Sequence, residues 1–424
     1  MSDERRRFQT SIESIVGSAH VTEQTALQID GLIPRLIVHP GSADEVAACL
    51  RVCSDEDAAV VPAGRMSWLE SGNQLKRCDV ALSLDRMQNA IEYSPPDLIV
   101  TVQAGLTLCQ LNAMSKGERQ WLPLDPPGFE VASLGAIASC NSSGALRLGF
   151  GTPRDYVIGL KLAHVDGTQS KCGGRVVKNV AGYDMNKLYV GSFGTLAVMT
   201  ELTFKLRPLP ERTATVMITS KYRGPLFKLA KEILGPDFQP ASVVLTRRLG
   251  VSNGANWPDD ALLIRFVDSE TAVNVQLGQI SELVGDDCKV REVDEAEAFT
   301  VWKAVADFDS HEVQLRLSVL LSAVPAEFEK ALLLQFECVA TADIGAGIIR
   351  MAFDANHRNA VDLIKKLRRT TSTGSVFVEK APVEVRREVD AWSDVGSTAE
   401  LMRSIKNSFD PHSILNPGKF IYGL

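Results

Sequence analysis

The chain has 424 residues, of which 45% are hydrophobic and 23% charged, and its formal net charge is −7. This composition is typical of a globular protein, and the length favours two domains. The mild acidity disfavours nucleic acid as the main partner, because a phosphate backbone needs a basic face. No apolar run approaches the roughly 20 residues that span a bilayer, and the N-terminus lacks a signal-peptide pattern. We therefore expect a cytoplasmic protein that reaches a membrane at most through a partner.

The eight cysteines and six histidines limit the possible chemistry. Zinc sites and iron–sulfur clusters usually draw on closely spaced thiolates, but these cysteines are scattered and form no CxxC pair. No two histidines stand at the spacing of an HExxH ligand pair. We expect that the chain binds no metal, carries no cluster and keeps its cysteines as free thiols in a reducing compartment.

In chain order, the first half of the sequence alternates short apolar strands with amphipathic helices, which is typical of α/β or α+β folds. Strands are expected at residues 36–38, 58–61, 80–84 and 99–102, and helices at 44–52 and 107–115. Twelve of the 31 glycines then fall between Gly128 and Gly194. Glycine is used where the backbone turns sharply or approaches a ligand, although a loop-rich region is the alternative.

The sequence changes in character after Pro208 and Pro210, which end a strand and stiffen the following connection. Beyond them strands and helices alternate with few glycines, so we place a domain boundary at residue 210. Strands are expected at 242–246, 262–266, 313–320 and 348–353, and helices at 226–234, 271–284, 327–336 and 360–367.

Two common diphosphate-binding motifs, the P-loop GxxxxGK[ST] and the Rossmann GxGxxG, do not occur in the chain. Gly149-Phe150-Gly151 begins like the second motif, but Arg154 stands where its last glycine belongs. Gly345-Ala346-Gly347 fails in the same way at Arg350. A bound dinucleotide would therefore need another fold.

Three other segments are suited to a dinucleotide. Residues 61–68 turn directly after a strand, where successive backbone N–H groups can form a phosphate nest, although an ordinary turn is the alternative. Residues 133–144 combine small side chains with the neutral donors of serine and asparagine. Residues 155–198 contain Asp166-Gly167, a hairpin signal between two apolar runs.

These three segments, in this order, resemble the PCMH-type FAD-binding domain of the vanillyl-alcohol-oxidase superfamily. Residues 174–184, with the sequence GRVVKNVAGYD, are similar to the FAD-binding subunits of glycolate oxidase, the GlcE type. Residues 409–419, which include Ile414-Leu415-Asn416-Pro417-Gly418-Lys419, resemble the common ending of these flavoproteins. The resemblance covers most of residues 30–210 and the last twenty residues.

The resemblance implies an α+β chain with a two-lobed FAD-binding domain at residues 30–210. It implies an α+β cap domain with an antiparallel sheet at residues 211–400, and a segment at 401–424 that returns to the flavin. The FAD is expected to be non-covalent, because no histidine lies near Ser67 and Trp68. The cofactor-binding residues that it implies are Pro62, Ala63, Gly64, Arg65, Met66, Ser67, Leu134, Gly135, Ala136, Ser139, Asn141, Ser142, Gly149, Gly151, Val198 and Asn416.

The catalytic residues stay unknown at this point. The catalytic flavoenzymes that this chain resembles carry a Gly-His motif and a second histidine in the cap. The comparable stretch of this chain, residues 342–351, contains no histidine. The candidates are Arg316, His311 and Arg350. An arginine facing the flavin can clamp a carboxylate with two hydrogen bonds, but a solvated outer strand face explains Arg316 equally well.

The function that the resemblance implies is an FAD-dependent oxidoreductase acting on CH–OH groups. We expect a subunit of a glycolate oxidase or dehydrogenase complex, which oxidises 2-hydroxy acids such as glycolate to glyoxylate. The expected partners are a histidine-containing flavoprotein subunit and an iron–sulfur subunit that accepts the electrons. One alternative is a self-sufficient FAD-dependent D-lactate or 2-hydroxy-acid dehydrogenase, and another is a non-catalytic flavin-binding assembly subunit.

Overall fold

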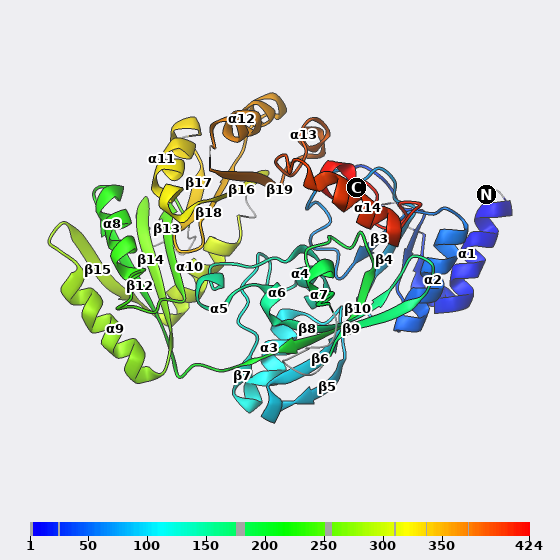
Figure 1. The fold of residues 1–424 in the computed structure, drawn as a ribbon, viewed down its shortest axis with the longest axis horizontal. Coiled ribbons are helices and arrows are strands. Elements are labelled where there is room, and N and C mark those ends of the chain that lie inside the picture. The colour runs from blue at the N-terminus through cyan, green and yellow to red at the C-terminus, as the bar shows by residue number, and fades with distance from the viewer. Residues whose placement is uncertain are drawn as a thin grey trace.

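The computed structural model describes residues 3–23, 26–174, 183–250, 257–308, 311–335, 337–371 and 373–424. Residues 175–182, the centre of the GRVVKNVAGYD motif, therefore lie outside the described residues. Figure 1 shows two lobes of a first domain joined to a cap, with the C-terminal helix returning to the first domain.

The first lobe contains a four-stranded sheet in which β2 and β3 run parallel to the central β4. Its strands, in sheet order, are β1 (Val21–Thr22), β2 (Leu36–Val38), β4 (Val80–Ser83) and β3 (Val60–Ala63). Helices α1 (Asp3–Val16) and α2 (Ala43–Asp55) pack beside each other on this sheet. The Ser42 hydroxyl caps α2 by accepting the Glu45 N–H at 3.1 Å, and the helix buries Val46, Leu50 and Cys53 as its spacing predicts.

The second lobe is a five-stranded antiparallel sheet. Its strands, in sheet order, are β5 (Ala90–Ser94), β6 (Ile99–Gln103), β10 (Val198–Lys205), β8 (Val157–Ala163) and β9 (Gln169–Gly173). The predicted hairpin at Asp166-Gly167 joins β8 to β9, with Gly167 at φ 76°. Short elements between the strands are α3 (Leu108–Ser115), β7 (Gln120–Trp121), α4 (Leu134–Cys140), α5 (Arg147–Phe150), α6 (Pro153–Tyr156), α7 (Asn186–Tyr189) and β11 (Arg207–Pro208).

The cap is built on an eight-stranded antiparallel sheet. Its strands, in sheet order, are β15 (Cys288–Val293), β12 (Arg212–Ser220), β14 (Asp260–Asp268), β13 (Ser242–Arg247), β17 (Val339–Asp343), β18 (Ile348–Phe353), β16 (Val313–Val319) and β19 (Gly374–Lys380). The remaining helices are α8 (Arg223–Ile233), α9 (Glu270–Leu283), α10 (Glu295–Ala306), α11 (Val324–Leu334), α12 (His357–Thr370), α13 (Val383–Glu388) and α14 (Thr398–Phe409).

The two faces of the cap sheet have different partners, because side chains alternate along each strand. One face packs under α8, α9, α11 and α12 and forms an apolar core. The other face carries Met217, Val244 and Leu263, which pack with Ala145 of the first domain. The second face therefore turns toward the first domain. Its polar side chains are candidates for a functional site between the cap and that domain.

The C-terminal segment joins the sheet of the first lobe. Leu415 forms a parallel bridge with Val60 on β3, and the Val60 N–H donates to the Ile414 carbonyl at 2.8 Å. The last residues of the chain thus lie beside the loop that follows β3.

The described residues were also searched for disulfides, metal-binding clusters and membrane-spanning helices. Their eight cysteines are free thiols, and no three His, Cys, Asp or Glu side chains in the described ranges gather closely enough to hold a metal ion. Within the same ranges, no helix is long and apolar enough to cross a membrane.

Candidate functional site

A pocket of about 790 Å³ opens where the loop after β3, helix α4, the residues before β10 and the C-terminal segment meet. The predicted cofactor residues that line it are Pro62, Ala63, Gly64, Arg65, Met66, Ser67, Gly135, Ala136, Ser139, Val198 and Asn416. Phe193 and Lys419 also line the pocket. Sequence reasoning missed both of them, although Lys419 ends the C-terminal motif.

Two glycines let the walls of this pocket approach each other. A Cβ atom on Gly64 would lie 1.8 Å from the Ser133 hydroxyl, so only glycine fits at this point of the loop. A Cβ on Gly135 would lie 2.9 Å from the Ala104 Cβ, which lets α4 sit against the end of β6. The loop also holds Met66 at φ 60°, a left-handed conformation of the kind that clusters at functional sites.

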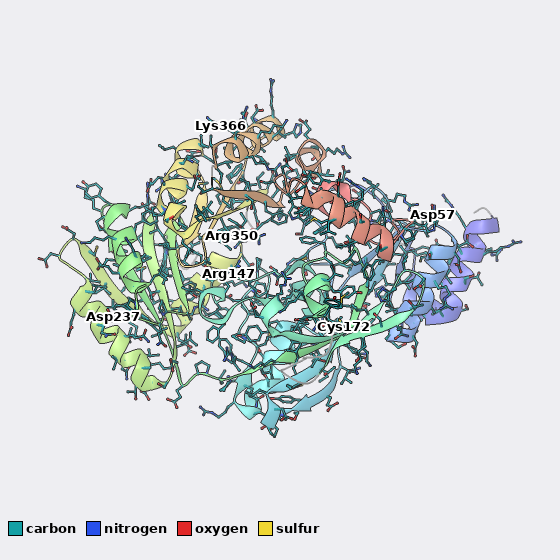
Figure 2. The ribbon with its side chains drawn as sticks, in the orientation of Figure 1. Asp57, Arg147, Cys172, Asp237, Arg350 and Lys366 are labelled. Atoms are coloured by element: carbon teal, nitrogen blue, oxygen red, sulfur yellow. The ribbon has the colours of Figure 1, made fainter. Side chains whose placement is uncertain are left out.

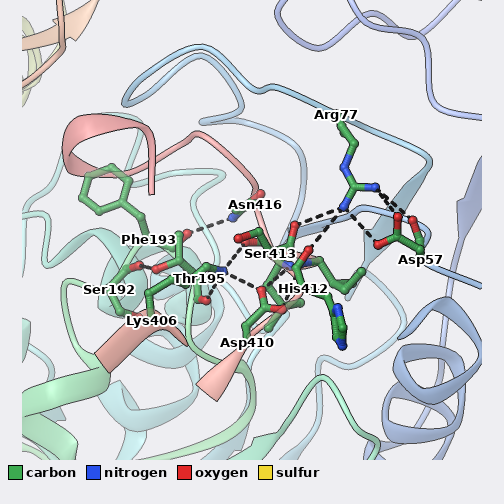
Figure 3. Close-up of polar contacts among 12 residues, drawn as sticks. Asp57, Arg77, Ser192, Phe193, Thr195, Lys406, Asp410, His412, Ser413 and Asn416 are labelled. Carbon is green, nitrogen blue, oxygen red and sulfur yellow. Dashed lines mark hydrogen bonds and ion pairs between the residues drawn. The ribbon is translucent and has the colours of Figure 1, made fainter. Parts of the chain in front are cut away.

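Figure 3 shows how buried polar contacts anchor the C-terminal segment against the pocket. The Lys406 ammonium donates to the Asp410 carboxylate at 2.5 Å and to the Leu415 carbonyl at 3.0 Å. Asp410 in turn accepts the Leu415 N–H at 2.8 Å. The segment ends with Asn416 in the pocket wall, where its Nδ2 donates to the Phe193 carbonyl at 2.8 Å.

Arginines gather on the cap face that turns toward the first domain. Arg316 on β16 and Arg350 on β18 are direct partners in the sheet register. The Arg350 Nε donates to the Glu379 carboxylate at 2.8 Å, whereas the Arg316 guanidinium lies over the Phe377 ring, 5.0 Å from its centroid. Phe377 contacts Phe193 of the pocket wall with ring centroids 6.4 Å apart. Arg316 is therefore separated from the pocket lining by one aromatic ring.

The histidines of the cap pair with carboxylates away from the pocket lining. His311 precedes β16 and its Nδ1 lies 3.2 Å from Asp354. His357, which begins α12, lies 3.0 Å from Glu388. The structure thus provides no described contact between either imidazole and the pocket.

Comparison with known proteins identifies two domains of the chain. Residues 34–173 match the family described as FAD binding domain, and residues 391–420 match the FAD linked oxidases, C-terminal domain. Glycolate oxidase subunit GlcD of Bacillus subtilis is 27% identical, over 91% of this chain and 89% of its own length. Glycolate oxidase subunit GlcE of Escherichia coli is 32% identical, over 43% of this chain and 49% of its own length. The chain carries an FAD binding domain and the C-terminal domain of FAD linked oxidases. It is an oxidoreductase that acts on CH–OH groups, with FAD as its cofactor.

The fold of the chain is that of the PCMH-type flavoproteins. The structure of p-cresol methylhydroxylase superposes with a TM-score of 0.78 at 11% identity, covering 99% of this chain and 97% of the other. The predicted α+β class, with an antiparallel cap sheet, is confirmed.

The pocket fits the cofactor in charge and in hydrogen bonding. Its lining includes the Arg65 guanidinium and no carboxylate, which suits a diphosphate, whereas the Lys419 ammonium in the lining is already paired with Asp30 at 3.0 Å. The Asn416 Oδ1 is buried without a hydrogen-bond partner among the described residues. Buried acceptors are rarely left unpaired, so this oxygen is available to a donor on the cofactor.

Five of the predicted cofactor residues do not line this pocket. Leu134 is fully buried in the core, and the Asn141 Oδ1 accepts the Arg154 N–H of α6 at 3.1 Å. Gly149 faces the cap, because its Cβ would lie 2.8 Å from the Ala241 backbone. The remaining two are Ser142 and Gly151. Contacts between these five and FAD stay predictions.

A buried carboxyl group on the cap face predicts a pH dependence of stability. Burial raises the pKa of Asp343 to about 7, while Arg147 and the Ala346 N–H oppose the shift. An unfolded aspartate ionises near pH 4, so between about pH 4 and pH 7 the folded chain keeps a proton that the unfolded chain releases. Stability therefore falls as the pH rises through this window.

Replacing Asp343 by asparagine removes this loss. We expect the free energy of unfolding of the variant, relative to that of the parent protein, to rise between pH 5 and pH 8 by up to about 3 kcal/mol. Urea unfolding at both pH values measures the gain. A difference between variant and parent that stays constant with pH would contradict the prediction.

Proposed function

We propose that this chain is the FAD-binding subunit of a glycolate oxidase or dehydrogenase complex. The complex oxidises 2-hydroxy acids, such as glycolate to glyoxylate, and passes the electrons to an iron–sulfur subunit. The observation that carries the proposal is the cationic Arg316 next to the cofactor pocket, separated from it by Phe377. A carboxylate held there brings the neighbouring hydroxyl-bearing carbon toward the pocket, and FAD, when bound, accepts a hydride from that carbon.

The residues of this chain orient the substrate and exclude water. Arg316 and Arg350 supply the positive charge that a carboxylate needs, and the rings of Phe193 and Phe377 form an apolar wall beside it. The substrate hydroxyl must also lose its proton. His311 does not line the described pocket, so we assign it no part in this proton transfer. A partner flavoprotein subunit that carries histidines fits this requirement.

The proposed partners follow from what the described part of the chain lacks. Electrons from a reduced flavin need an acceptor, and the described cysteines form no cluster. The similarity to both GlcD and GlcE, together with the GRVVKNVAGYD motif, supports a complex in which this chain is the GlcE-type member.

The proposal is tested with the purified chain alone and with its complex. We expect the chain alone to show flavin absorbance, and acid precipitation to release the FAD, because no histidine lies in the loop after β3. Anaerobic glycolate is expected to bleach the flavin in the complex but not in the isolated chain. Bleaching of the isolated chain by glycolate or D-lactate would instead identify a self-sufficient dehydrogenase. Failure of the complex to bleach would indicate a non-catalytic assembly subunit.

A further inference from the structure

Two arginines from different domains share the interface between α5 and the cap sheet. Arg147 begins α5 in the first domain, and Arg316 lies on the cap face that turns toward that domain. Figure 2 shows Arg147 and Arg350, the sheet partner of Arg316, in the same region between the cap and the first domain.

Both guanidinium groups lack hydrogen-bond partners among the described residues. Arg147 makes no side-chain hydrogen bond and no ion pair in the described part of the chain. The Arg316 Nε is buried and makes no hydrogen bond, and the nearest carboxylate oxygen, on Glu379, is 3.8 Å away. Each guanidinium has five N–H donors, so most of this donor capacity is unused.

Arg350, the sheet partner of Arg316, is well paired on the same face. Arg350 donates to Glu379 at 2.8 Å and to the Ala306 carbonyl at 2.6 Å. Arg265 lies 3.6 Å from Asp125 and stacks on Trp302, and its buried Nε, like that of Arg316, makes no hydrogen bond among the described residues. Glu379 is therefore already held by Arg350 and cannot fully neutralise Arg316.

The two unsatisfied cations also repel each other. Burial lowers the pKa of Arg147, the carboxyl of Asp343 opposes this, and the charge of Arg316 lowers it further. Like charges that meet at a partly buried interface with free donors are costly unless an anion lies between them.

We propose that Arg147 and Arg316 form a single anion site across the domain interface, which holds the carboxylate of the substrate with one guanidinium from each domain. This inference rests on the proposed function and adds Arg147 as a binding residue. The site adjoins the cofactor pocket through Phe377 and Phe193. Because the two arginines belong to different domains, the bound carboxylate also ties the cap to the first domain.

Oxalate, a carboxylate that cannot donate a hydride from carbon, is the probe. The FAD-loaded chain is titrated with oxalate, and binding is followed by calorimetry and by the change in flavin absorbance. Losing one charged hydrogen-bond partner corresponds to about 1.5–3 kcal/mol. We therefore expect Arg147→Gln and Arg316→Gln each to raise the Kd by about 10- to 100-fold. Arg147→Lys should restore part of the affinity, because it keeps the charge but loses the paired donors.

The control variant is Arg154→Gln, because Arg154 is an exposed arginine on the nearby helix α6. Its Kd should stay within about twofold of the parent value. An unchanged Kd in Arg147→Gln, or no oxalate binding by the parent chain, would overturn the anion site. The proposed function is tested separately, by flavin bleaching with glycolate in the complex. An unchanged Kd in Arg147→Gln leaves that function in place, whereas the absence of oxalate binding by the parent chain also removes the carboxylate site at Arg316.

Discussion

Replacing Asp30 by alanine is expected to destabilise the folded chain by about 3–5 kcal/mol, because it leaves two buried cations without their counter-ion. The Asp30 carboxylate is fully buried between Arg386, whose Nη2 lies at 2.6 Å, and Lys419, whose Nζ lies at 3.0 Å. Both cations are themselves almost completely buried. The three residues come from the loop before β2, from α13 of the cap and from the C-terminal segment, so the cluster joins both domains.

The pH dependence of this cluster has a definite sign. Burial opposes ionisation of Asp30, but Lys419 and Arg386 together hold its pKa below the ordinary value. The contribution of Asp30 is therefore present at neutral pH. It is lost as the pH falls through the lowered pKa of the folded state.

Urea unfolding at pH 7 measures the effect, with Asp57→Ala as the matched control. Asp57 also pairs with an arginine, Arg77, at 3.0 Å, but its side chain is 70% exposed. Exposed ion pairs contribute at most about 1 kcal/mol, so the control should lose little stability. Equal losses in the two variants would show that Asp30 carries no special structural role.

Replacing Ala136 by tryptophan is expected to weaken FAD retention by about 10- to 100-fold, the equivalent of an overpacking cost of about 1–3 kcal/mol. Ala136 is a partly exposed residue of α4 that lines the pocket, so a larger side chain enters the space of the cofactor. Gly135 is less suitable for this test, because its Cβ would point at Ala104 and disturb the packing of α4 instead.

The ratio of flavin to protein absorbance after gel filtration measures retention. Ala326→Trp on α11 is the control, because Ala326 is exposed on the side of the cap that faces away from the first domain. The control should retain FAD like the parent, and circular dichroism should show that both variants are folded. A flavin content in Ala136→Trp equal to that of the control would mean that the cofactor lies elsewhere.

Local features of this fold could be predicted because short-range interactions create them. The helix after Ser42 depends on a cap three residues away, and the turn at Gly167 needs only a residue that tolerates positive φ. The loop of residues 62–67 lines the pocket and is shaped by a motif of consecutive residues, and its contacts with FAD stay predictions. The GlcE-like motif added the cofactor, which residue patterns alone left open.

Other parts of the site could not be predicted because distant segments form them. The alternation of β16 places Arg316 opposite Leu315 and Leu317 from sequence alone. Whether that face met solvent or the first domain depended on how the cap packs, and only the structure shows that it meets the first domain. Arg147 is a similar case, since nothing near it in the sequence indicates a second arginine opposite.

The sequence by itself determined the α+β class, through its resemblance to the PCMH-type flavoproteins, because that resemblance is carried by motifs of neighbouring residues. Only the tertiary structure decided which charges meet. Asp30 and Lys419 are separated by 389 positions, yet their side chains lie 3.0 Å apart in the folded chain. No local pattern encodes such a contact, because a charged residue is equally compatible with solvent until the fold removes the water around it.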